Sequence, residues 1–151
     1  MRARWVGLNA ALVGSVTTLE MKRQFEQART ALREPQPFAT VASLLEFLGS
    51  EGANLEDKNT IYSALVRAAQ ARALWASLAA SVLWCGLWPG LDAMYQRQRR
   101  YFAHDPEELI SLITVVFTTL IGNLDLQCVK RVPATLIRST EREVVRARQR
   151  Q

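Results

Sequence analysis

The sequence predicts an all-α protein built as one compact helical domain. Apolar residues recur at steps of three and four along most of the 151 residues, which is the spacing of one face of an α-helix. No segment alternates strictly between apolar and polar residues, as a half-buried strand would. Helix start and stop signals also interrupt the apolar pattern, such as Thr40, Gly49 and the pair Asp105-Pro106. With 49% hydrophobic residues, the chain is long enough to bury a single core.

Residues 1–20 begin with Arg2 and Arg4 and continue through a short apolar stretch, as a secretory signal does. Asn9 interrupts this stretch, and no small-x-small cleavage site precedes the charged residues that follow it. Met21 opens a more ordinary start, Met-Lys-Arg-Gln-Phe. We therefore expect residues 1–20 to be a loose extension or a mis-assigned start that contributes nothing to the fold.

Residues 21–58 are expected to form N-terminal helices. Leu19, Phe25, Ala28 and Leu32 predict an amphipathic helix that ends before Pro35 and Pro37. A shorter helix follows, with Thr40 as its N-cap and Gly49 as its stop. Its apolar face is formed by Val41, Leu44, Leu45 and Leu48.

A long helix is predicted to begin at Asp57 or Asn59 and to bend or end at Gly86 and Pro89. Residues 73–91 carry no charge and reach the length of a membrane span. The same stretch contains serines and many small residues, which suits a core helix surrounded by neighbours. We interpret it as a buried helix with Leu74, Leu78 and Val82 on one side, and a membrane anchor is the alternative. The aromatic residues of this region are expected to pack in the core: Trp75, Trp84, Trp88, Tyr95 and Tyr101.

Asp105 followed by Pro106 predicts the start of the next helix, with Glu107 and Glu108 at its positive end. Eight apolar residues then form a core-facing stripe: Leu109, Leu112, Ile113, Val116, Phe117, Leu120, Ile121 and Leu124. The opposite face carries no charge after Glu108. Exposed helix faces usually carry Lys and Glu, so this face is expected to be covered by a partner protein or by the rest of the fold.

The last predicted helix, introduced by Pro133, holds the excess charge of the protein. Residues 129–151 contain seven bases and two acids, and this surplus equals the net charge of +5 of the whole chain. Arg131, Arg138, Arg142 and Arg146 fall along one edge of a helix with 3.6 residues per turn. Such a row can follow a phosphate backbone, or it can be an ordinary solvated face.

The order of these elements resembles region 2 of the sigma-70 family of bacterial transcription initiation factors, in a divergent, stand-alone form. The resemblance covers about residues 60–148, within a predicted domain of residues 59–151. A buried helix ending in Leu-Trp-Pro-Gly-Leu-Asp-Ala-Met-Tyr-Gln-Arg-Gln-Arg-Arg (87–100) leads to Asp-Pro-Glu-Glu-Leu-Ile (105–110). A long apolar helix follows and runs into Leu124-Asp125-Leu126, and the segment 130–144 forms a basic helix. We expect no second DNA-binding domain, the region 4 of full sigma factors, after this helix.

The resemblance implies two surfaces. The start and the outer face of the helix that follows Asp105 would dock on the β′ clamp helices of RNA polymerase, through Glu108, Ser111, Leu112, Thr114 and Thr118. The basic helix would contact promoter DNA through Arg131, Arg138, Arg142 and Arg146, with Thr135, Leu136 and Ile137 at further matching positions. Leu136 and Ile137 replace the aromatic pair that stacks on bases in housekeeping members, so melting of DNA by this protein alone is not expected.

The sequence therefore predicts a cytoplasmic, non-enzymatic, sigma-like transcription protein with no cofactor, no metal and no small-molecule substrate. His104 has no predicted nucleophile partner, and there is no glycine-rich phosphate loop. Cys85 and Cys128 are expected to be buried thiols of a reducing compartment rather than a disulfide. Two alternatives remain: a degenerate helical protein-interaction module without DNA binding, and a small membrane-anchored protein.

Overall fold

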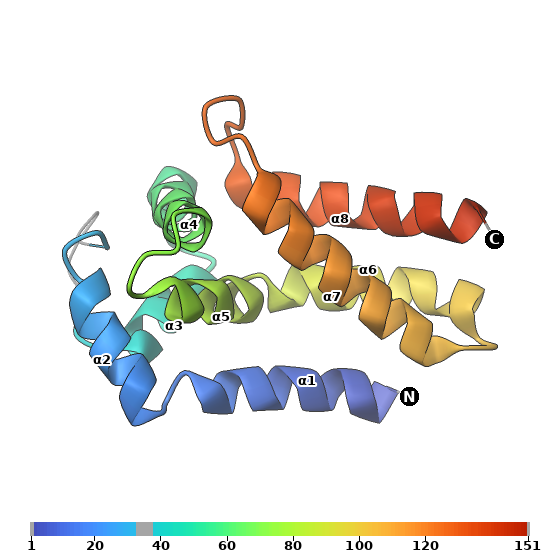
Figure 1. Ribbon diagram of the computed structural model, residues 1–151, viewed down its shortest axis with the longest axis horizontal. Coiled ribbons are helices and arrows are strands. Elements are labelled where there is room, and N and C mark those ends of the chain that lie inside the picture. The colour runs from blue at the N-terminus through green and yellow to red at the C-terminus, as the bar shows by residue number, and fades with distance from the viewer. Residues whose placement is uncertain (1, 33–37, 151) are drawn as a thin grey trace.

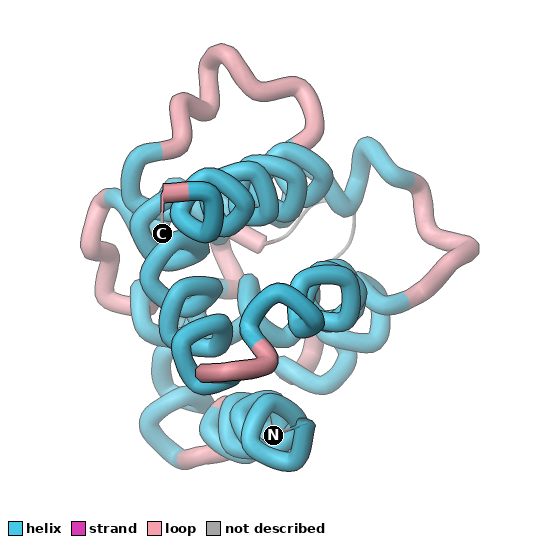
Figure 2. The backbone as a smooth tube through the Cα atoms, turned by 90° about the vertical axis from the view of Figure 1, so that its right-hand side faces the viewer, coloured by secondary structure: helices cyan, strands magenta, loops and turns pink. Residues whose placement is uncertain are grey.

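The computed structural model describes residues 2–32 and 38–150, and this part of the chain is all-helical, which confirms the fold class (Figure 1). Within these residues the helices are joined by short loops, and no strand is present (Figure 2). Pro35 and Pro37, the expected stops of an N-terminal helix, lie outside the described residues. The elements are α1 Arg2–Ser15, α2 Leu19–Ala28, α3 Val41–Gly49, α4 Leu55–Gln70, α5 Ala76–Gly86, α6 Trp88–Gln98, the 3₁₀ helix η1 Arg99–Phe102, α7 Pro106–Asn123 and α8 Val132–Gln149.

Local capping chemistry fixes several helix starts. Thr40 and Ser43 form a capping box at the start of α3, with Thr40 Oγ1 accepting from the Ser43 backbone N–H at 3.1 Å. Asp105 caps α7 as expected, accepting from the Glu108 N–H at 3.4 Å. The start of α4 differs from the prediction because Asn54, rather than Asp57 or Asn59, is its N-cap. Asn59 instead accepts a hydrogen bond of 2.6 Å from the Val132 N–H, which ties α4 to the start of α8.

The predicted long central helix is interrupted. α4 ends at Gln70, Arg72 adopts a left-handed conformation with φ 52°, and α5 begins only at Ala76. Leu74 lies in this break and is 79% exposed, whereas Leu78 and Val82 are buried as expected. Residues 73–91 are therefore a break followed by α5 and the start of α6, and among the described helices none is long and apolar enough to cross a membrane.

The N-terminal segment differs from the expected loose extension because α1 contributes to the core. Trp5 is fully buried and stacks on Trp88 and Tyr95 of α6, with ring centroids 4.4 and 4.7 Å away. Its indole N–H donates to Asp92 Oδ1 at 3.0 Å. α1 and α8 lie on opposite sides of the molecule, with α5 and α6 between them (Figure 1). The next helix, α2, is shorter than predicted, and Leu19 at its start is 66% exposed rather than inside.

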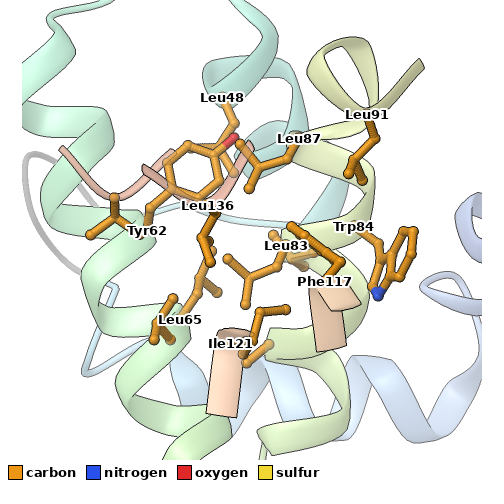
Figure 3. Packing of buried hydrophobic residues seen from close by; sticks show 14 of the residues in the cluster. Leu48, Tyr62, Leu65, Leu83, Trp84, Leu87, Leu91, Phe117, Ile121 and Leu136 are labelled. Carbon is orange, nitrogen blue, oxygen red and sulfur yellow. The ribbon is translucent and has the colours of Figure 1, made fainter. Parts of the chain in front are cut away.

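Side chains from α3, α4, α5, α6, α7 and α8 meet in one core (Figure 3). They include Leu65 of α4, Leu83 of α5, Phe117 of α7 and Leu136 of α8, all fully buried. Two glycines permit close approach of neighbouring elements: a Cβ on Gly86 would lie 2.5 Å from Tyr62 Oη, and one on Gly90 would lie 3.0 Å from Ile137 Cγ1. This packing fixes which faces of α7 and α8 point outward.

Candidate nucleic-acid and protein interfaces

The two sides of α8 have different chemistry. Its inner side buries four residues one turn apart: Val132, Leu136, Thr140 and Val144. The arginines predicted to form a row are all exposed: Arg131, Arg138, Arg142 and Arg146. Arg131 is the N-cap residue just before α8, and within α8 the 3.6-residue repeat keeps Arg138, Arg142 and Arg146 in solvent while the opposite stripe packs in the core.

The arginines of the row differ in how far neighbouring groups compensate them. Arg146 pairs with Glu143, with Nη1 and Oε1 2.7 Å apart. Arg142 donates to the Ser139 hydroxyl at 3.3 Å, a neutral partner. For Arg131 and Arg138, the described part of the chain supplies neither an ion pair nor a side-chain hydrogen bond. Three positive charges of the row, those of Arg131, Arg138 and Arg142, are therefore uncompensated.

Glu141, the other acid of α8, is directed away from the row. Its carboxylate binds Arg97 of α6 through two hydrogen bonds, Nη2 to Oε1 at 2.6 Å and Nε to Oε2 at 3.0 Å, and accepts from Gln98 Nε2 at 2.9 Å. The Arg97 hydrogen bonds lower the pKa of Glu141, and the same contact raises the pKa of Arg97. The ion pair fastens α8 to α6 and removes a negative charge from the outer face.

Beyond its first turn, which carries the exposed Glu107, the outer face of α7 is uncharged and exposed. Six residues line it: Ser111, Val115, Thr118, Thr119, Gly122 and Asn123. Val115, the large apolar side chain of this face, is 62% exposed. The rest of the described fold does not cover this face, so the cover that the sequence led us to expect is not supplied by the described residues. α7 packs directly against α8, so the uncharged face and the arginine row are on neighbouring helices (Figure 1).

The five residues proposed for docking are not equivalent. Ser111 and Thr118 are exposed, whereas Glu108, Leu112 and Thr114 are half-buried. Leu112 packs against the core, and the Thr114 hydroxyl donates to the Ile110 carbonyl at 2.8 Å. Ser111 and Thr118 are therefore the two members fully presented to a partner.

Leu136 and Ile137, the two positions that match the base-stacking pair of housekeeping sigma factors, lie on the inner side of α8. Leu136 is fully buried, because it belongs to the stripe that packs α8 on the core. Ile137 is half-buried, and its side chain closely approaches Gly90 of α6. Neither side chain is presented on the outer face of α8.

A second basic group, not predicted as a site, lies where α6, η1 and α8 meet. It contains Arg97, Arg100 and Arg148 around Tyr101, which is exposed rather than in the core as expected. The run Gln96–Arg100 indicates positive charge in the sequence, but its pairing with Arg148 depends on the tertiary fold.

The cysteines and the histidine form no common site. Cys85 is half-buried, and burial raises the pKa of its thiol. Cys128 is exposed in the loop before α8, contrary to the expectation of a buried thiol, and its Sγ donates to Asp125 Oδ2 at 3.1 Å, which raises the pKa of Cys128. In the described residues both thiols are free, and no three His, Cys, Asp or Glu side chains gather where they could hold a metal ion.

Comparisons of the chain with protein-family models, with curated proteins and with solved structures found no match. Family membership is therefore not assigned to this protein.

Proposed function

We propose that this protein is a non-enzymatic, sigma-like transcription protein that docks on RNA polymerase through α7 and contacts promoter DNA through α8. The observation that carries the proposal is the exposed, uncompensated row of Arg131, Arg138 and Arg142, next to the uncharged exposed face of α7. Guanidinium groups along one helix edge suit the spaced phosphates of a nucleic acid, and each contact releases counterions. An uncharged neighbouring face suits a protein partner, since interface cores are depleted in charge.

The expected mode of DNA binding is contact with phosphates. Leu136 is buried and Ile137 is packed on α6, so no apolar side chain at these positions reaches the bases. Phosphate contacts position a protein on DNA without reading sequence. Promoter selection in this proposal therefore comes from the polymerase assembly, and α8 adds affinity.

Salt dependence of DNA binding tests the role of α8. Three phosphate contacts predict a slope of log K against log salt concentration of about −2.7 for duplex DNA. Fluorescence anisotropy of a labelled duplex measures this slope for the whole protein. Changing Arg131, Arg138 and Arg142 together to Gln should bring the slope close to zero.

A matched control removes three other exposed bases, Lys22, Arg23 and Arg67, which lie on α2 and α4. This variant has the same net charge as the α8 variant and should keep the steep slope. Equal loss in both variants would mean that net charge, not the row, attracts DNA, and would contradict the proposal.

The α7 surface is tested by retention on RNA polymerase core enzyme. Val115→Arg and Thr118→Arg place a large charged side chain on the uncharged face and should abolish retention, while both positions tolerate it in the free protein because they are exposed. Gln27→Arg, at an exposed position of α2, is the control and should bind as the unmodified protein does. Failure of the unmodified protein to bind polymerase would refute the docking half.

A helical protein-interaction module without DNA binding is the second candidate, favoured by the 62% exposure of Val115. The two functions differ in what Arg131, Arg138 and Arg142 do. Replacing the three by Glu should abolish function in the sigma-like protein and leave it intact in the interaction module. Val115→Arg should disable both.

A further inference from the structure

A basic hollow of about 420 Å³ lies where the end of α6, η1 and the end of α8 come together. It is lined by Gln96, Arg97, Gln98, Arg100, Tyr101 and Arg148, without an acidic side chain among these residues. At 3.6 residues per turn, Arg148 lies about 120° around α8 from Arg142. The hollow is therefore a different surface from the arginine row, and the inference from it does not depend on the proposed function.

Two of its three arginines lack an acidic partner. Arg97 is held by Glu141 with two hydrogen bonds, so its charge is compensated. Arg100 Nη2 donates to Tyr101 Oη at 2.6 Å, and the Arg148 guanidinium lies over the Tyr101 ring, 3.6 Å from its centroid. Two cations thus share one tyrosine, an arrangement that an anion placed between them would stabilise.

The hollow also holds a pair of unsatisfied polar atoms. Among the described residues, two buried side-chain nitrogen or oxygen atoms lack a hydrogen-bond partner, and these are Arg148 Nε and Gln98 Oε1. The Gln98 amide cannot be reversed to relieve this, because its nitrogen donates to the Glu141 carboxylate, which only accepts. Both atoms are shielded from solvent, so a ligand reaches them only when the Arg148 side chain moves off the Tyr101 ring. Such a ligand must accept from an arginine and donate to an amide oxygen.

We propose that this hollow binds a small oxyanion that retains an O–H group, of the class of hydrogen phosphate. Its charged oxygens would accept from the guanidinium groups of Arg100 and Arg148, which present planar donor forks to such groups. Its O–H would donate to Gln98 Oε1. Binding draws Arg148 away from the Tyr101 ring, so the side-chain Nε–H resonance of Arg148 reports on the site directly.

The test is a titration of the whole protein with inorganic phosphate in a phosphate-free buffer, followed by calorimetry and by NMR of arginine side chains. We expect one saturable site that shifts the Arg148 Nε–H resonance. Arg148→Gln and Arg100→Gln should each weaken binding about 10- to 100-fold, since each removes a charge-assisted hydrogen bond. Arg148→Lys keeps the charge but loses the fork and should also weaken binding, and circular dichroism checks that each variant is folded.

Two controls separate a built site from general positive charge. Arg138→Gln removes an exposed charge from the same helix and should leave phosphate affinity within about twofold of the unmodified protein, because this side chain lies outside the hollow. Sulfate has a similar size but no O–H, so it should bind more weakly than phosphate. Equal affinity for sulfate, equal loss with Arg138→Gln, or absence of saturable phosphate binding would each overturn the proposal.

Discussion

Replacing Trp5 by Ala should destabilise the whole domain, because this side chain packs α1 into the core against α6. Trp5 is fully buried between Trp88 and Tyr95 and donates its indole N–H to Asp92. An aromatic side chain buries about 150–250 Å², which at ~25 cal/mol per Å² is worth about 4–6 kcal/mol. Measured aromatic-to-Ala substitutions in cores cost about 3–5 kcal/mol, and we expect a loss of about 4 kcal/mol in the free energy of unfolding.

Urea denaturation followed by far-UV circular dichroism measures this loss without depending on tryptophan fluorescence, which the substitution itself changes. Val6→Ala is the matched control, since Val6 is the next residue of α1 and is 48% exposed, and it should change stability by less than about 0.5 kcal/mol. Trp5→Phe keeps an aromatic ring but loses the hydrogen bond to Asp92, and should fall between the two. A loss below about 1 kcal/mol for Trp5→Ala would show that α1 is a loosely attached segment after all.

Two further predictions concern the packing around α5 and the ion pair of α8. Gly86→Ala should lower the free energy of unfolding by about 1–3 kcal/mol, because the new Cβ would lie 2.5 Å from Tyr62 Oη. This loss should be smaller in a Tyr62→Phe background, which lacks the hydroxyl. Equal losses in both backgrounds would contradict this contact. Because the hydrogen bonds of Arg97 lower the pKa of folded Glu141 below its unfolded value, the pair's contribution is complete above about pH 5 and is lost as pH falls through the folded pKa. Glu141→Gln should therefore lose less stability between neutral and acid pH than the unmodified protein does, and urea midpoints at several pH values check this.

Where helix boundaries are set by local chemistry, the sequence predicts them well. Thr40 and Asp105 can each hydrogen-bond a nearby backbone N–H whatever the rest of the chain does, and both cap helices in the structure. The repeat of apolar residues in α7 likewise identifies Leu109, Ile113 and Phe117 as core residues. These signals require only a few neighbouring residues to agree.

Features that depend on distant contacts could not be predicted in this way. The break between α4 and α5 contains good helix formers such as Ala71 and Ala73, and no Gly or Pro marks it. α4 and α5 pack against each other across the break, so the chain must turn between them. Arg72 makes this turn in a left-handed conformation, which is unfavourable for a residue other than glycine. The burial of Trp5 could not be predicted either, because its partners Trp88 and Tyr95 lie more than eighty residues away in the sequence.

The candidate site on α8 likewise combines features that the sequence predicts with features that depend on distant contacts. The periodicity of α8 correctly places Arg138 and Arg142 in solvent, because the buried stripe opposite them is visible in the sequence. The sequence alone treats the charges of residues 129–151 as one basic patch, yet the fold divides them. Glu141 turns toward Arg97, and Arg148 joins Arg100 at Tyr101.

This division lowers the charge that either surface can use. Arg146 is paired with Glu143, Arg148 belongs to the hollow beside α6, and Lys130 and Arg150 are not members of the row. The outer row therefore retains three uncompensated arginines, fewer than the surplus of five counted from the sequence. A row that used all five charges would give a salt slope of about −4.5 instead of about −2.7. The measured slope therefore distinguishes a cationic helix that acts as a whole from one whose opposite sides serve separate anions.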